Sequence, residues 1–228
     1  LYEAYIKYYL LPEKNIFEKY KKIFKNFIKN IFLNENSCVK KLFVDTFPVM
    51  EDNYFINEDL LNFIFDKKIT AFNYLNKKLT GIIISSNLDI FIKVNFIHNN
   101  DTIETEICIF AAFIVILIHE LSNFILIYIF KHLGIKEYEK SFFFKENEEP
   151  EIGRFIEKKL FGRVIEEMNL IEAIYILNIN NFYRKNPKQF LNGFINLKKK
   201  KTIDKLEDSV KDFLNSVDII LNKKLNLN

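Results

Sequence analysis

The feature that most constrains the fold is a long apolar run, residues 107–130, with His119 and Glu120 near its middle. Its length would suffice for a transmembrane helix, which needs roughly 20 apolar residues. An ionised carboxylate at the centre of a span would, however, cost about 2.5 kcal/mol or more on insertion scales. In a soluble protein, a helix that is apolar on all sides must be covered by other helices. The run therefore predicts either a membrane span or a central buried helix.

The remainder of the chain can supply such a cover, because 49% of its 228 residues are apolar. Its 33 basic and 30 acidic residues are interspersed and give a net charge of +3. The only dense basic run, Lys198 to Lys201, is interpreted as a solvated linker or helix start, with a phosphate or lipid contact as the alternative. We therefore expect no nucleic-acid partner; a membrane is the alternative partner, and the sequence identifies no other.

The two cysteines, Cys38 and Cys108, form no CxxC pair. This favours a reducing compartment, so we expect an intracellular, cytoplasmic protein, with membrane association through residues 107–130 as the alternative. No signal peptide can be recognised. The chain begins at Leu1, which indicates a fragment or a processed product.

Helical patterns dominate the first third of the chain. Apolar residues recur every three or four positions over residues 12–32, with Pro12 near the first turn. A second helix is predicted from a cap at Asn57 to Leu79, where Thr80 and Gly81 interrupt the pattern. Pro48 restricts any strand between the two helices to a sheet edge. These helices define a possible N-terminal helical subregion over residues 1–80.

A short β element is predicted next. The β-branched residues 81–86 and the alternating residues 88–98, with a turn at Asn87, predict a small antiparallel hairpin. Asp101 and Glu104 then form a capping-box pattern, and Gly134 marks the end of the helix that contains the apolar run. The hairpin should thus precede a central buried helix.

The rest of the chain predicts further helices. One runs from Pro150 to Gly162, one is capped by Asn169 and Glu172, and another starts at Asn186 and Pro187. Residues 202–225 carry a last amphipathic pattern. With no repeat to divide the chain, we expect a single domain, residues 1–228, of the α+β class and mostly helical.

Glu120 requires compensation if the apolar helix is buried. An unpaired carboxylate is costly in an apolar interior, so an arginine, a hydrogen-bond network, protonation or a metal-linked water must satisfy it. Arg154 is the candidate partner, since Arg163 and Arg184 are the only other arginines. The simplest interpretation of His119 and Glu120 is a buried pair satisfied by hydrogen bonds.

The segment "HELSN", residues 119–123, resembles the active-site helix of the zincin metallopeptidases, whose motif is H-E-x-x-H. The resemblance implies that His119 is the first zinc ligand and Glu120 the general base that activates a zinc-bound water. Asn123 stands at the second ligand's position, on the face of the helix that His119 occupies. An amide oxygen is a poorer zinc donor than an imidazole, so zinc binding should be weak or absent.

In the gluzincin branch a glutamate from a later helix is the third ligand, and the resemblance offers Glu151 or Glu157. Gly153 between them would allow a close approach of this helix to another. The competing interpretations are a helix-dipole acid for Glu151 and a solvated partner of Arg154 or Lys158 for Glu157. Ile129 excludes the metzincin pattern, which requires a histidine at that position.

The resemblance predicts a zincin-like metallopeptidase homologue with a defective zinc site and little or no activity; if active, it is a zinc-dependent peptidase. It further predicts Glu151 or Glu157 within about 3–5 Å of His119. The alternative is a membrane-embedded or membrane-apposed structural helical protein, whose apolar run would not be covered by helices. The sequence contains no GxSxG elbow or phosphate-binding glycine loop, and it predicts no substrate.

Overall fold

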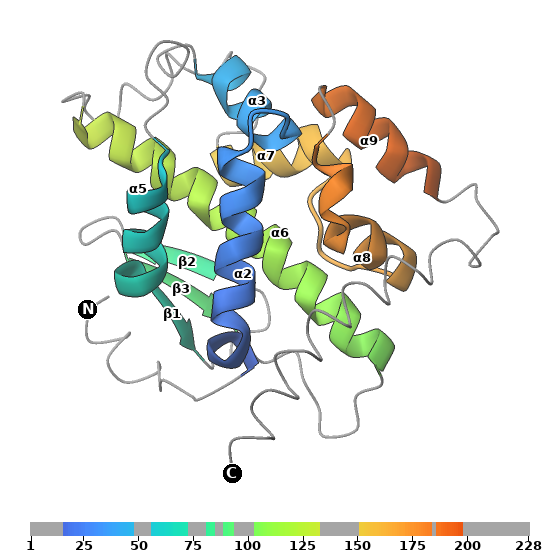
Figure 1. Ribbon diagram of the computed structural model, residues 1–228, viewed down its shortest axis with the longest axis horizontal. Coiled ribbons are helices and arrows are strands. Elements are labelled where there is room, and N and C mark those ends of the chain that lie inside the picture. Colours follow the sequence, from blue (N-terminus) through green and yellow to red (C-terminus); the bar gives the residue numbers. More distant parts are fainter. Residues whose placement is uncertain are drawn as a thin grey trace.

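The computed structural model describes residues 16–47, 56–72, 81–84, 89–93, 103–132, 151–183 and 186–197. In this part of the chain seven α-helices dominate the architecture (Figure 1). They are α2 (Ile16–Leu33), α3 (Cys38–Thr46), α5 (Glu58–Phe63), α6 (Ile103–His132), α7 (Ile152–Phe161), α8 (Leu170–Leu177) and α9 (Pro187–Asn196). A π-helical turn, Ile64–Lys68, a 3-10 turn, Ile179–Asn181, and three short strands complete the described elements.

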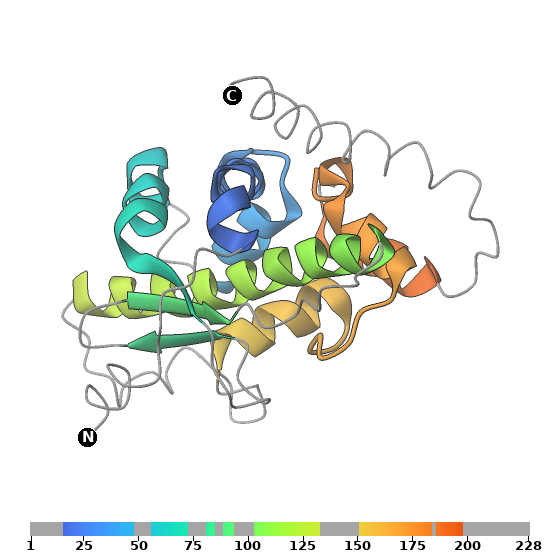
Figure 2. The same cartoon turned by 90° about the horizontal axis from the view of Figure 1, so that it is seen from below.

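The apolar run forms the centre of α6, and the other helices surround it. Figure 2 shows α6 between α2 on one side and α7 on the other, and α8 also packs against it. Phe113, Leu117, Ile118, Leu121 and Phe124 of α6 have no exposed surface. Burying side chains of this size stabilises a fold by about 1.5–3 kcal/mol each. The core of the described residues is therefore built around this helix.

Helix α2 covers α6 through the apolar face that its sequence predicts. The Phe24 ring lies 5.6 Å from the Phe110 ring and 5.3 Å from the Phe113 ring. On the other face, Lys25 and Lys29 form ion pairs with Asp66 and Glu58, 2.8 and 2.7 Å long. The amphipathic helix is thus confirmed from Ile16 onward, and Pro12 lies outside the described residues.

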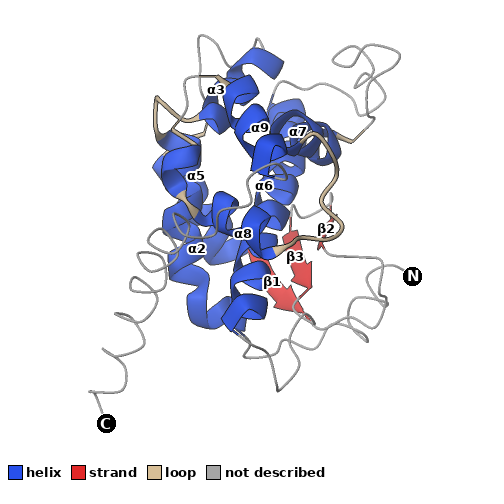
Figure 3. Cartoon of the chain, turned by 90° about the vertical axis from the view of Figure 1, so that its right-hand side faces the viewer, coloured by secondary structure: helices blue, strands red, loops and turns tan. Residues whose placement is uncertain are grey.

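The predicted α+β class with a small antiparallel hairpin was wrong. The body is helical, and the strands β1 (Ile69–Phe72), β2 (Gly81–Ile84) and β3 (Asp89–Lys93) form a mixed sheet of order β1-β3-β2 at one side (Figure 3). β3 pairs parallel with β1 and antiparallel with β2. The turn predicted at Asn87 lies outside the described residues, so no hairpin is described. The two-strand prediction failed because it overlooked β1, a parallel partner distant in sequence.

The predicted helix from Asn57 to Leu79 was also too long. Asn57 caps α5 as expected, accepting a hydrogen bond of 2.8 Å from the Leu60 amide. After Phe63 the chain makes the π-helical turn and continues as β1. The β-branched Ile69 and Thr70 fit an extended strand, and their pairing with β3 overrides the local helical pattern.

The helix ends later in the chain agree with the sequence. Asn169 and Glu172 form the predicted capping box at the start of α8, and Asn186 caps α9 ahead of Pro187. Gly162 ends α7 in the left-handed conformation, with φ of 74°. The predictions at Asp101, Gly134, Pro150, Lys198 to Lys201 and residues 202–225 lie outside the described residues.

Helix α6 is long and apolar enough to cross a membrane, and among the described residues it is the one helix of that kind. Within the segment Ile107–Tyr128, 83% of the residues in the most apolar window are buried inside the protein. The core helix of a soluble protein passes the same test, so length and composition do not place the chain in a membrane. The cover that α2, α7 and α8 give to α6 is not the open apolar band that a lipid-facing structural protein would show.

Candidate functional site

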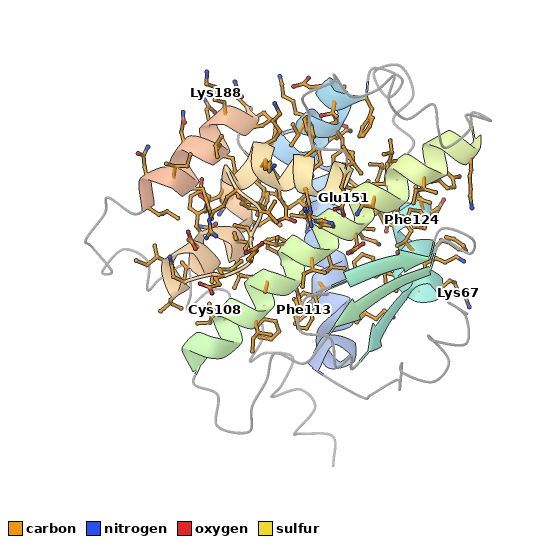
Figure 4. The ribbon with its side chains drawn as sticks, turned by 180° about the vertical axis from the view of Figure 1, so that it is seen from behind. Lys67, Cys108, Phe113, Phe124, Glu151 and Lys188 are labelled. Atoms are coloured by element: carbon orange, nitrogen blue, oxygen red, sulfur yellow. The ribbon has the colours of Figure 1, made fainter. Side chains whose placement is uncertain are left out.

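The predicted site residues meet where the middle of α6 crosses the start of α7. His119, Glu120 and Asn123 project from α6, Glu151 is the N-cap residue of α7, and Glu157 belongs to the second turn of that helix. Figure 4 shows Glu151 beside the middle of α6. The structure thus brings together all five residues singled out in the sequence.

The His119 ring lies between two carboxylates. Its Nε2 is 2.7 Å from Oε1 of Glu151, and its Nδ1 is 2.5 Å from Oε1 of Glu157. The side chains of His119 and Glu157 are 17% and 5% exposed, whereas that of Glu151 is 42% exposed. The ring is therefore enclosed on its Nδ1 side and approached by solvent on the Glu151 side.

Gly153 makes this close approach possible. A Cβ atom at that position would lie 2.5 Å from Cδ2, 2.5 Å from Nε2 and 2.7 Å from Cε1 of the His119 ring. Such similar distances to three ring atoms place the glycine against the face of the imidazole. Only a residue without a side chain lets α7 pack so close to the ring, as its sequence position suggested.

Asn123 is bonded to α7 through both ends of its amide. Its Nδ2 donates to Oε1 of Glu151 over 3.1 Å, and its Oδ1 accepts from the Gly153 amide over 2.9 Å. The second oxygen of Glu151 forms an ion pair with Nε of Arg154, 3.1 Å away. Arg154 was predicted as a candidate partner of Glu120, but the ion pair it forms is with Glu151.

Glu157 ties the ring to the segment that follows α7. Its Oε2 accepts a hydrogen bond of 2.7 Å from the backbone amide of Ile165, while its Oε1 faces His119. Glu157 is thus a buried bridge rather than the solvated partner of Arg154 that helical spacing suggested. The contribution of the Ile165 amide was missed, because nothing in the sequence signals which backbone group will meet a buried carboxylate.

The two carboxylates favour a protonated His119. Burial alone would lower the pKa of the imidazole, but the hydrogen bonds to Glu151 and Glu157 and the nearby negative charge raise it to about 10. The hydrogen bond from His119 lowers the pKa of the Glu151 carboxyl below its usual value. At neutral pH the centre of the site is therefore an imidazolium that donates from both ring nitrogens.

Glu120 is buried beside this charged group, with 6% of its surface exposed. Burial raises the pKa of its carboxyl to about 7, because the opposing charge of His119 and the Asn123 amide offset only part of the desolvation. Glu151 and Glu157 add to the rise by repulsion. A carboxyl that titrates near neutrality can exchange a proton with a bound molecule, as general acids and bases do.

As arranged, these residues do not fit a zinc ion. Two donors on one tetrahedral zinc, each about 2.0–2.2 Å from the metal, lie about 3.3 Å apart. Nε2 of His119 and Oε1 of Glu151 are 2.7 Å apart, the spacing of a hydrogen bond. The Asn123 oxygen is engaged by the Gly153 amide. Among the described residues, no group of three or more His, Cys, Asp or Glu side chains is placed to hold a metal.

No protein-family model, curated protein or solved structure matches this chain. The chemistry of the site therefore rests on its own geometry.

Proposed function

We propose that the chain is a zincin-like metallopeptidase homologue whose zinc site is defective, and which is inactive or only weakly active as a peptidase. The observation that carries the proposal is the contact of 2.7 Å between Nε2 of His119 and Oε1 of Glu151. It joins the histidine of the H-E-x-x-N segment to a glutamate on a later helix, which is the pairing the zincin resemblance implies. Glu120 is then the counterpart of the general base.

The surroundings of the ring support this assignment. Nδ1 of His119 faces the buried Glu157, and carboxylate partners of this kind orient zinc-binding histidines through the nitrogen that does not bind metal. This arrangement favours Glu151 over Glu157 as the third-ligand position.

The defect is attributed to Asn123. A histidine there would lie one helical turn from His119 and aim a second imidazole at Glu151. The amide instead turns its oxygen to the Gly153 amide and its NH2 group, which has no electron pair to offer a cation, to the Glu151 carboxylate. With one ligand missing and the remaining pair hydrogen-bonded, zinc affinity and peptide hydrolysis should both be low.

The proposal is tested by giving the site back its missing imidazole. Protein purified without detergent is dialysed against zinc and chelator buffers, and bound zinc is measured for the wild type, Asn123→His and Asn123→His with His119→Gln. Asn192→His, at an exposed position of α9, is the matched control. We expect stoichiometric zinc in Asn123→His, retained when Glu120→Gln is added, and none in the other proteins.

Absence of zinc from a folded Asn123→His variant would contradict the relation to zincins. Stoichiometric zinc in the wild type, together with cleavage of a peptide library that Glu120→Gln abolishes, would contradict the defect. A protein that is soluble only in detergent would favour the alternative, a membrane-embedded or membrane-apposed structural protein. The evidence for that alternative is the apolar composition and length of α6.

A further inference from the structure

The first turn of α7 lacks a cap of its own. Its N-cap residue, Glu151, makes no side-chain hydrogen bond to the backbone amides of the turn. The carboxylate instead accepts from His119 and Asn123 and forms an ion pair with Arg154. The first amides of a helix have no partner within the helix, and a buried amide left without one costs about 1–3 kcal/mol. Gly153 carries one of these amides and is buried.

The missing cap is supplied from α6. Oδ1 of Asn123 accepts from the Gly153 amide over 2.9 Å, which is the bond that an N-cap side chain would ordinarily make to the second residue of the helix. The Nδ2 of the same amide donates to Glu151 over 3.1 Å and so holds the N-cap side chain as well. One side chain therefore satisfies a donor and an acceptor on the neighbouring helix at once.

We infer that Asn123 is a metal-independent clamp, a helix cap supplied from α6 that fixes the start of α7 against the His119 ring. The inference rests on the proposed function only in treating position 123 as a former ligand position. In a zinc site the metal would join these two helices by bonding to side chains of both. Here the Asn123 amide and the Nε2 contact of His119 make the same connection.

The clamp explains why the donors do not fit zinc. Asn123 and His119 donate to the same oxygen, Oε1 of Glu151, and draw it to hydrogen-bond distance from Nε2. A metal could enter only after both of these bonds were broken. Removing metal from the wild-type protein should therefore leave the start of α7 unchanged.

Hydrogen exchange of single backbone amides tests the clamp. In Asn123→Ala the Gly153 amide loses its acceptor, so its exchange should accelerate at least about tenfold. The Phe155 amide, which bonds to the Glu151 carbonyl over 3.0 Å, is the internal control and should change by less than about threefold. Asn123→Asp keeps an acceptor oxygen but replaces the donor with a carboxylate oxygen that repels Glu151, so Gly153 should keep more of its protection than in Asn123→Ala but less than in the wild type. The wild-type unfolding midpoint should be equal in chelator and in zinc.

Unchanged Gly153 protection in Asn123→Ala, or equal acceleration of every amide in α7, would overturn the clamp. So would Gly153 protection in a folded Asn123→Asp protein that is no greater than in Asn123→Ala, or a wild-type midpoint that rises in zinc. If Asn123→Ala does not fold, the zinc measurement decides. Zinc uptake by Asn123→His bears on the proposed function alone, so either idea can fail while the other stands.

Discussion

Gly153→Ala should destabilise the protein, although alanine is normally the better helix residue. The change places a methyl group 2.5 Å from both Cδ2 and Nε2 of His119. Cβ atoms in proteins essentially never come within 3.0 Å of such atoms. The ring cannot simply swing away, because hydrogen bonds to Glu151 and Glu157 hold its two nitrogens. Either the ring or α7 must move, and the bonds between the helices weaken.

The size of the effect follows from two opposing contributions. Replacing glycine by alanine inside a helix stabilises it by about 0.5–1 kcal/mol. Overpacking of a closely packed site costs about 1–3 kcal/mol. The net change therefore lies between about zero and 2.5 kcal/mol, and the short contacts with a ring held at both nitrogens favour the upper part of that range. We expect the free energy of unfolding to fall by about 1–2.5 kcal/mol, with the hydrogen bonds of His119 most affected.

Urea unfolding at neutral pH measures this difference, provided that the slope of the transition is unchanged. Gly193→Ala, at a partly exposed position of α9, is the matched control and should stabilise the protein slightly. If Gly153→Ala were as stable as the wild type or more so, the close packing of α7 against the His119 ring would be refuted.

Two further predictions concern charge. The pKa of His119 is raised to about 10 and that of Glu120 to about 7, so both groups bind protons more tightly in the folded state than in the unfolded chain. Thermal stability should accordingly fall as the pH rises from about 4.5 to 10. In His119→Gln the fall above pH 7 should be smaller than in the wild type. Equal falls above pH 7 in the two proteins would contradict the raised pKa of His119. Separately, Arg163→Met should cost about 1–3 kcal/mol in urea unfolding, because it leaves the Glu172 carboxylate, 3% exposed and 3.0 Å from Arg163, without its cation. The matched change Arg154→Met removes an exposed pair and should cost less than about 1 kcal/mol, so equal losses would argue against a special role for the buried pair.

Helix boundaries set by local chemistry could be predicted from the sequence. Asn57, Asn169 and Asn186 cap their helices through atoms only two or three residues away, so the signal and the contact lie in the same short segment. β1 could not be predicted in this way. Its residues lie within a helical pattern, and their extended state depends on pairing with β3, about twenty residues later.

The candidate site could likewise be predicted only where the signal is local in the sequence. Helical spacing places His119 and Asn123 on one face, and the zincin resemblance indicates Glu151 or Glu157 as the third member of the site. Which carboxylate meets which ring nitrogen depends on how α7 is positioned on α6, and no local pattern encodes that. The Asn123 bond to the Gly153 amide was missed for the same reason, because a backbone donor looks alike at every position of a sequence.

The central claim is that His119 is a metal-free imidazolium held by two carboxylates, and nitrogen-15 NMR of its ring tests this most directly. The chain has three histidines, so comparison with His119→Gln assigns the signals. We predict that both ring nitrogens of His119 carry protons at pH 7 and that equimolar zinc leaves their shifts unchanged. A ring with one unprotonated nitrogen at pH 7, or one that loses a proton to zinc, would contradict the account.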